Sequence, residues 1–103
     1  MVRVTVLYPN SPDAKFDMQY YVTHHLPMVR DKCAPVCRSI AAEGGLAGGD
    51  PGSKAPYVAI GHLTFDSLSA FQDAFIPNAP AILADIPNYT NIKPIIQISD
   101  ITL

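Results

Sequence analysis

The chain begins with an alternation of hydrophobic and polar residues that predicts a β-strand with two different faces. After a loop that holds two prolines, the spacing changes to three and four residues, which predicts a helix from Asp17 to about Lys32. Asp17 stands where a helix N-cap is expected. One face of the strand holds Val2, Val4, Val6 and Tyr8, and the other holds Arg3, Thr5 and Leu7.

Two further strands follow the first helix. Residues 36–43 are typical of a second strand, and residues 57–65 of a third. The glycine-rich segment between them, residues 44–53, is not expected to bind phosphate, because a phosphate-binding loop precedes a helix and here a strand follows. We expect this segment to form a long, mobile hairpin connection.

The last part of the chain predicts a helix and a strand. The helix is expected from Leu68 to Phe75, with Pro77 interrupting it and a restart that reaches about Ile86. The final strand is expected over residues 92–101. The order β-α-β-β-α-β predicts an α+β, ferredoxin-like fold, in which a four-stranded antiparallel sheet carries two helices on one face. One domain is expected to span residues 1–103.

Composition adds a prediction about assembly. Charged residues make up 16% of the 103 residues, which is low for a small monomer. The third strand is largely apolar on both faces, yet the two helices cover only one face of the sheet. We therefore predict a homodimer in which the second, apolar faces of two sheets pack together.

Charge and cysteine content exclude several classes of function. The net charge is −2 and the seven basic residues are scattered, so nucleic acid is not an expected partner. The chain carries neither a signal-peptide pattern nor an apolar run long enough to span a membrane, and we expect a cytoplasmic protein. Cys33 and Cys37 match no redox pair or complete zinc set, so we expect free thiols and no metal. No nucleotide, haem or non-haem iron motif is evident, and no cofactor is expected.

His25 is the first candidate for chemistry. The helical spacing places this imidazole on the apolar face of the first helix, whereas His24 belongs to the opposite, solvent-facing side. Burial tends to lower the pKa of an imidazole, which leaves a neutral base at physiological pH. Pro27 is expected to bend or end the helix near residues 23–26 and to free a carbonyl close to His25. The spacing is equally compatible with a core histidine that is satisfied by one or two hydrogen bonds.

Several short motifs, in order along nearly the whole chain, resemble the EthD family. Each run is moderately specific, and their joint order is strong. They are VLYPN at residues 6–10, FDMxYY at 16–21, HLPMV at 25–29, GLAGGxPGS at 45–53, APYVAIGHLTFDS at 55–67 and DIPNYT at 85–90.

The resemblance implies a fold, a pocket and a biological setting. EthD proteins are dimeric α+β barrels, in which two ferredoxin-like sheets pack face to face and each subunit keeps a pocket between its sheet and its helices. The family is named after a cluster for degrading ethyl tert-butyl ether, in which the member accompanies a cytochrome P450 oxidoreductase system. Because the motif around His25 matches the family and the wider superfamily places acid–base histidines in this pocket, the resemblance favours a catalytic role for His25.

Five other residues are candidates for binding a substrate in that pocket: Tyr8, Tyr21, His62, Asp85 and Tyr89. The tyrosines could equally be core aromatics, and Tyr89 could pack over the last loop. His62 could face the dimer interface, since strand parity does not say which face meets the helices. Asp85 could be a cap, and it matters for chemistry only if it reaches a histidine, whose tautomer it would then fix.

Two main functions are compatible with these residues. The first is a cofactor-free enzyme, such as an isomerase, cyclase or dehydratase, that acts on a small, mostly apolar, oxygenated molecule with His25 as acid or base. The second is a binding or accessory protein that holds a hydrophobic metabolite for an oxidoreductase. A structural dimer with a vestigial pocket is a third reading. The sequence identifies neither the substrate nor any turnover.

Overall fold

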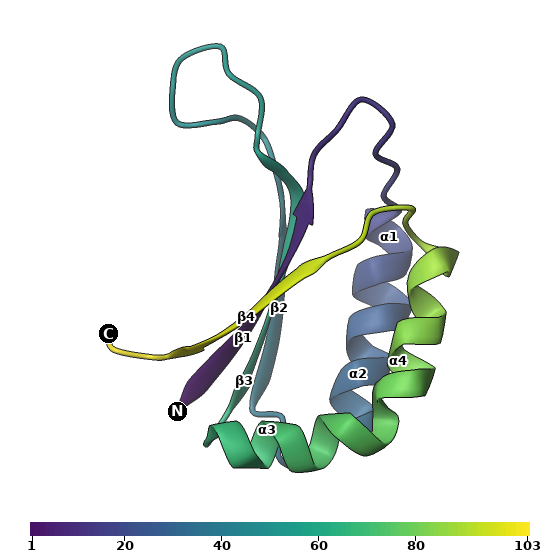
Figure 1. Ribbon diagram of the computed structural model, residues 1–103, viewed down its shortest axis with the longest axis vertical. Helices are drawn as coiled ribbons and strands as arrows, with labels where there is room; N and C mark the ends of the chain where they lie inside the picture. The colour runs from purple at the N-terminus through teal and green to yellow at the C-terminus, as the bar shows by residue number, and fades with distance from the viewer.

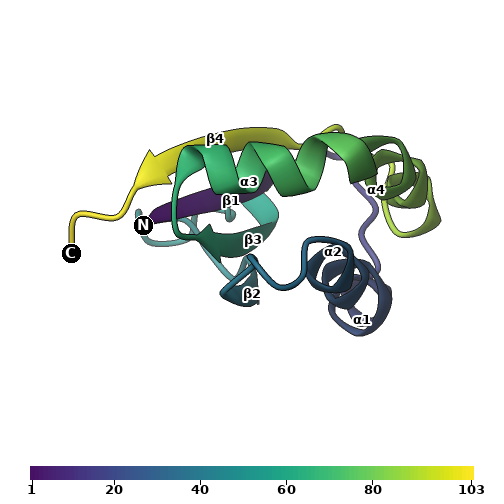
Figure 2. The ribbon, with the colours of Figure 1, turned by 90° about the horizontal axis from the view of Figure 1, so that it is seen from below.

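A four-stranded antiparallel sheet and two helices, each with an irregular turn next to a proline, make up the computed structural model, which describes all residues 1–103. The strands run in the order β2-β3-β1-β4, and the helices lie on one face of the sheet (Figures 1 and 2). The ferredoxin-like topology predicted from the sequence is confirmed. The elements are β1 (Val2–Pro9), α1 (Met18–Tyr20), α2 (Leu26–Lys32), β2 (Ser39–Gly44), β3 (Tyr57–Phe65), α3 (Leu68–Phe75), α4 (Ala79–Asp85) and β4 (Ile95–Asp100).

Two strands are shorter than their sequence pattern predicts. β2 begins at Ser39 and not at residue 36, because the amides of Val36 and Cys37 both bond to the carbonyl of Cys33 in a turn. β4 begins at Ile95, directly after Pro94, which has no amide hydrogen to give to the sheet. No helix in the structure is both long enough and apolar enough to cross a membrane.

The first helix continues through Pro27 instead of ending there. Asp17 caps it, with its carboxylate accepting the amide of Tyr20 at 3.1 Å. Between α1 and α2 the chain forms a π-helical turn, Tyr21–His25, in which the amide of Leu26 bonds to the carbonyl of Tyr21. A π turn directly before a proline relieves the steric conflict that a regular helix would face. Pro27 therefore widens the helix where the sequence predicted a bend or an end.

The wider turn changes which residues the helix buries. Tyr21 and His25 stand one above the other, with ring centroids 5.7 Å apart and planes nearly parallel at 15°. Leu26 and Val29 continue this buried side, whereas Val22, which regular spacing assigns to the same face, is exposed. π turns occur often at functional sites, and this one places the imidazole.

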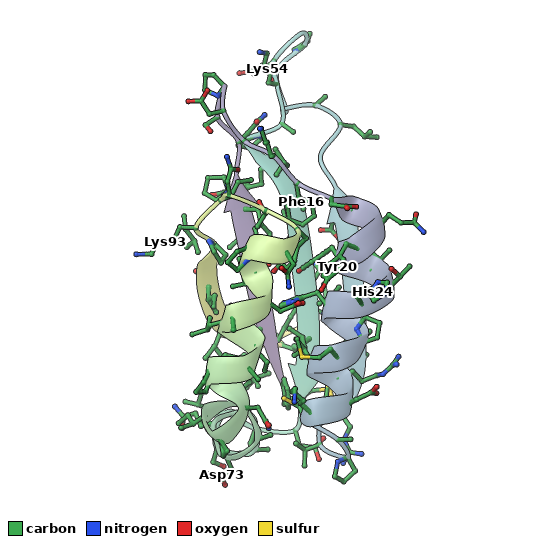
Figure 3. All side chains as sticks on the ribbon, turned by 90° about the vertical axis from the view of Figure 1, so that its right-hand side faces the viewer. Phe16, Tyr20, His24, Lys54, Asp73 and Lys93 are labelled. Carbon is green, nitrogen blue, oxygen red and sulfur yellow. The ribbon has the colours of Figure 1, made fainter.

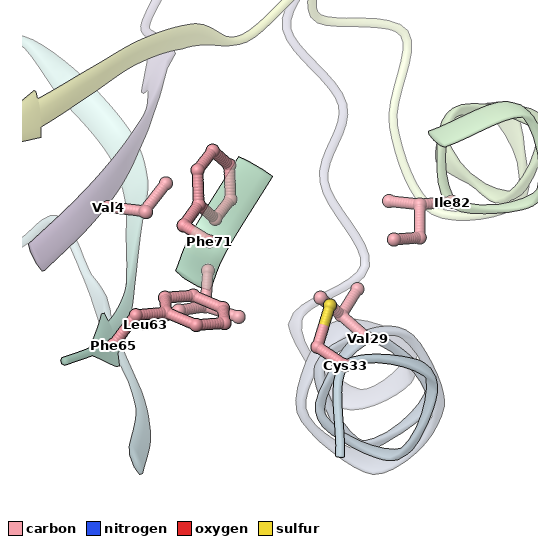
Figure 4. Packing of buried hydrophobic residues seen from close by; sticks show 7 residues of the cluster. All are labelled: Val4, Val29, Cys33, Leu63, Phe65, Phe71 and Ile82. Carbon is pink, nitrogen blue, oxygen red and sulfur yellow. The ribbon is translucent and has the colours of Figure 1, made fainter. Parts of the chain in front are cut away.

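The second helix is bent by its prolines into two arms. Ser67 caps α3 by accepting the amide of Ala70 at 3.1 Å, and a 3-10 turn, Ile76–Asn78, joins α3 to α4. α4 runs alongside the first helix, and α3 crosses one end of the layer between helices and sheet (Figure 1). The apolar cluster beneath them draws on the sheet, on α2, on α3 and on α4 (Figure 4).

The glycine-rich segment joins β2 and β3 as a hairpin connection, as predicted. Its base is tied to the sheet by the amide of Gly45, which bonds to the carbonyl of Val58 at 2.9 Å. A side chain at position 45 would collide with the carbonyl of Tyr57, so this close approach requires glycine. The mobility of the tip stays a prediction.

The sheet face opposite the helices is less apolar than the sequence predicts. Across β1, β3 and β4 it forms three rows, and only the first is apolar. The rows are Leu7, Ile60 and Ile95; then Thr5, His62 and Gln97; then Arg3, Thr64 and Ser99. The expectation of a wholly apolar second face is corrected to an apolar band at one end.

Candidate functional site

A cavity of about 210 Å³ lies between the sheet and the helices. Its walls come from the inner faces of β1 and β3, from the first helix and from α3 and α4. The lining is apolar apart from the imidazole of His25, the thiol of Cys33 and the hydroxyls carried by Tyr8 and Tyr21. The cavity therefore has a single side chain that can gain or lose a proton near neutral pH.

His25 lies on the π turn, lines this cavity and is hydrogen-bonded to Asp85. Its Nδ1 lies 2.8 Å from Oδ2 of Asp85, at the end of α4, and the imidazole is almost fully buried. A carboxylate accepts from Nδ1–H, which places the lone pair of the neutral ring on Nε2. No protein group bonds to Nε2, and this atom is not occluded. The imidazole thus lines the cavity with its basic nitrogen unpartnered.

Burial lowers the pKa of His25 below its ordinary value of 6.5, although the hydrogen bond from Nδ1 to Asp85 acts in the opposite direction. For Asp85, burial favours a higher pKa, but hydrogen bonds from Tyr20, Asn88 and His25 outweigh it and hold the pKa below 3.8. At neutral pH the pair therefore consists of a neutral imidazole and a carboxylate.

Two residues that sequence reasoning missed hold the carboxylate of Asp85. The Tyr20 hydroxyl donates to Oδ1 at 2.6 Å, and the Asn88 amide donates to the same oxygen at 3.0 Å. Tyr20 also stacks on the exposed ring of His24, with centroids 4.9 Å apart (Figure 3). A local signal existed only for Asn88, which lies three residues after Asp85 in the DIPN run, whereas Tyr20 lies 65 positions from Asp85.

A group of tyrosines surrounds the inner end of the imidazole. The hydroxyls of Tyr8 and Tyr89 lie 2.8 Å apart, and the ring of Tyr89 lies 4.6 Å from that of His25. Tyr8 and Tyr21 line the cavity, whereas Tyr89 does not line it and instead contacts both Tyr8 and His25. Burial raises the pKa of all three phenols, so their hydroxyls stay protonated. The structure thus brings together four of the five further residues predicted from the sequence: Tyr8, Tyr21, Asp85 and Tyr89.

Gly61 in β3 makes room for this group. A Cβ at this position would overlap the hydroxyl of Tyr21, whose tip approaches the strand here. Cys33 lies at the other end of the cavity as a free, buried thiol whose pKa is raised by burial. No three side chains of His, Cys, Asp or Glu converge in the structure as a metal site would require.

His62 is the predicted residue that the structure does not bring to the cavity. It points from the opposite face of β3, where its Nε2 pairs with Glu43 of β2 at 3.0 Å. The expectation that His62 converges on the helix–sheet pocket is therefore corrected. The physical reason is strand parity: the inner face of β3 is set by Gly61, Leu63 and Phe65, and His62 falls between them.

Comparisons with solved structures agree with this architecture. An EthD-like protein from Ralstonia eutropha JMP134 is 37% identical, with a TM-score of 0.95 over 99% of this chain and 92% of that one. An ethyl tert-butyl ether D (EthD) family protein from Bacillus halodurans C-125 is 16% identical, with a TM-score of 0.67 over 99% of each chain. A protein from Arabidopsis thaliana is 12% identical, with a TM-score of 0.62 over 100% of this chain and 97% of that one, so these last two share the fold alone.

No curated protein matches the chain. The EthD domain, in contrast, matches residues 11–92, a segment that holds the whole His25–Asp85 pair and most of the cavity wall. Together with the Ralstonia structure, this match settles the classification. The chain belongs to the EthD family.

Proposed function

We propose that the protein is a cofactor-free acid–base enzyme that acts on a small, mostly apolar molecule with a carbonyl group. The observation that supports this most directly is the His25–Asp85 pair: a neutral imidazole, fixed at Nδ1 by a carboxylate, lines an apolar cavity with Nε2 unpartnered. A core histidine without a function would be expected to use both nitrogens or to have one sealed off.

The proposed chemistry is removal of a proton from the carbon next to the carbonyl. Nε2 of His25 takes the proton, and the C–H electron pair moves into a carbon–carbon double bond while the carbonyl π pair moves to oxygen. Asp85 stabilises the imidazolium that forms. The proton then returns to the same carbon, or to another atom of the enolate for isomerisation. Such transfer by one placed residue contributes about 10²- to 10⁴-fold.

A tyrosine hydroxyl would stabilise the negative oxygen of the enolate. Tyr8 and Tyr21 are the candidates, because both line the cavity and both remain protonated. A hydrogen bond that strengthens as charge develops on oxygen lowers the barrier more than it tightens binding of the neutral ketone. Tyr89 bonds to Tyr8 and would orient that hydroxyl.

Proton exchange tests this proposal without knowledge of the natural substrate. Phenylacetone, an uncharged ketone with an acidic benzylic position, is incubated with the protein in D₂O, and deuterium incorporation is followed by NMR. We expect exchange above the buffer rate that is lost in His25→Ala and kept in His24→Ala, since His24 is exposed on the other side of the helix. Equal exchange in wild type and His25→Ala would contradict the proposal.

A second function, a non-catalytic accessory protein for an oxidoreductase such as a cytochrome P450 system, uses the same cavity. It is favoured by the near-complete apolar lining, which suits storage of a hydrophobic molecule. Binding of phenylacetone with no deuterium incorporation, together with a faster reaction of the partner enzyme when the protein is added, would identify this function.

We also propose that the protein forms a homodimer through the sheet face opposite the helices. The apolar row of Leu7, Ile60 and Ile95 supports this, because two of these side chains are half-buried and Ile95 is exposed in the single chain. Light scattering at micromolar concentration should give twice the chain mass of 11.1 kDa. A monomer mass that persists at this concentration would contradict the dimer.

A further inference from the structure

We propose that the ligand of the cavity is an uncharged compound of about ten non-hydrogen atoms with one carbonyl oxygen, and that it enters between α4 and β4 with its apolar end leading. This proposal rests on the proposed function for the role of the oxygen. Its size, charge and route follow from the cavity walls.

The size follows from the volume. An apolar protein cavity of about 150 Å³ accommodates benzene. The cavity here is about 210 Å³, and it is bounded by packed side chains from several elements. A single ring with a short oxygenated side chain therefore fits, and a compound of three fused rings requires the walls to move.

The charge follows from the lining. Of the 17 residues that line the cavity, 15 are hydrophobic, and none is Lys, Arg, Asp or Glu. Asp85 stands behind His25 with its oxygens engaged by Tyr20, Asn88 and His25. A carboxylate placed inside would lose its water and meet no cation, since burial holds His25 neutral. An uncharged ligand avoids this cost.

The orientation follows from the two ends of the cavity. One end is a cluster of aliphatic and phenyl side chains, among them Leu63, Phe65 and Phe71 (Figure 4). The other end is the tyrosine cluster, in which Tyr8 and Tyr21 pack with Leu26 beside His25. The first end offers only the weak thiol donor of Cys33, whereas the second offers hydroxyls and an imidazole, so the oxygen lies at the second end and the ring lies toward α3.

The entry route is inferred from side chains that line both the cavity and the protein surface. Leu83, Ile86, Pro94 and Ile96 line the cavity and also line an open groove on the surface. Leu83 is 51% exposed and Ile96 48%, so this part of the wall is a thin boundary to solvent. Lys93, beside this boundary in the groove, extends away from the body of the molecule (Figure 3). The boundary between α4 and β4 is the entrance.

Three ligands of nearly equal shape test the ligand class. Phenylacetone has a ketone, phenylacetate replaces its methyl group with a charged oxygen, and isobutylbenzene replaces its carbonyl oxygen with a methyl group. Dissociation constants and shifts of the His25 ring signals are measured by NMR at neutral pH. We expect phenylacetone to bind most tightly, isobutylbenzene about three- to tenfold more weakly for the loss of one hydrogen bond, and phenylacetate at least about tenfold more weakly.

The controls separate the cavity from the surface. Phenylacetate that binds as tightly as phenylacetone in wild type and in Lys93→Ala would overturn the proposal, as would failure of all three ligands to bind. Leu83→Trp should slow association of phenylacetone severalfold, whereas Ile76→Trp, the same enlargement at an exposed site away from the cavity, should not. Equal association rates in the two variants would overturn the route.

The outcome is independent of turnover. If phenylacetone binds as expected but exchanges no deuterium, the ligand class holds and the enzymatic function fails. If deuterium exchange is fastest with anionic ketones or with ketones of three fused rings, the enzymatic function holds and the ligand class fails.

Discussion

Two histidines of this chain pair with carboxylates at similar distances, yet their surroundings differ on the two faces of the sheet. His25 Nδ1 lies 2.8 Å from Asp85, with side chains that are 6% and 18% exposed. His62 Nε2 lies 3.0 Å from Glu43, with side chains that are 24% and 57% exposed. Asp85 is held by two further donors, Tyr20 and Asn88, and Glu43 by none.

The second nitrogen of each ring makes the larger difference. Nε2 of His25 is open and its ring lines the cavity, whereas Nδ1 of His62 is occluded and has no partner. An imidazole–carboxylate pair can act as a base only if the carboxylate is fixed and the free nitrogen meets a substrate. The pair at His25 meets both conditions, and the pair at His62 meets neither.

Removal of each imidazole is expected to give the largest difference between the two pairs. His25→Ala should reduce deuterium exchange of phenylacetone by about 10²- to 10⁴-fold, because no other group in the cavity can take the proton. His62→Ala should leave the rate unchanged, since its ring lies on the opposite face. A comparable loss in both variants, measured by NMR on folded protein, would remove the distinction.

The carboxylates give the next largest effect. Asp85→Asn should reduce the exchange rate about 10²-fold, because an amide no longer fixes the tautomer or stabilises the imidazolium. The acidic limb of the pH–rate profile should also move to lower pH, since Asp85 favours a higher pKa of His25. Glu43→Gln is the matched change in the His62 pair. It should alter neither the exchange rate nor the position of the acidic limb of the pH–rate profile.

A single methyl group at Gly61 tests how tightly the inner face is packed. Gly61→Ala should lower the free energy of unfolding by about 1–3 kcal/mol, because its Cβ overlaps the Tyr21 hydroxyl and must displace that ring. Gly49→Ala, in the hairpin connection with nothing within 4 Å, should change stability by about 0.5 kcal/mol or less. Urea denaturation of both variants measures the difference, and equal stabilities would show that Tyr21 is free to move.

The smallest expected effect is the pH dependence of stability. Burial lowers the pKa of His25 below 6.5 in the folded chain. Between the two pKa values, the unfolded chain therefore binds a proton at His25 that the folded chain does not bind. The contribution of His25 to stability is therefore complete above about pH 6.5 and is lost as the pH falls from there toward the folded-state pKa. His25→Phe should show a flatter profile between neutral and mildly acidic pH. Unchanged pH dependence in that variant would place the titrating group elsewhere.

The periodicity of the chain was sufficient to predict the fold, because each element carries its own pattern and its own stop signal. β3 has the predicted ends, Tyr57 and Phe65, and α3 the predicted Leu68 and Phe75. Predictions were weaker where two local rules compete. Pro27 was expected to bend or end the helix near residues 23–26, but the helix accommodates it with one π turn, which also exposes Val22.

The outer face of the sheet also differs from what the pattern of a single strand predicts. Alternation in β3 alone indicates two apolar faces, but the outer face is shared with β1 and β4, whose polar residues Thr5 and Gln97 lie in the same row as His62. Register between distant strands decides the character of a face, and register is not encoded in any one strand.

Local sequence patterns were enough to predict the element order, the family, the burial of His25 and the candidate partners Tyr8, Tyr21, Asp85 and Tyr89. The folded arrangement was needed to learn that Asp85, 60 positions away, reaches His25, that Tyr20 and Asn88 bond to Asp85, and that His62 faces the other side. Local spacing fixes which side of an element a residue occupies. Which two sides meet depends on how helices and strands from distant parts of the chain pack around one cavity.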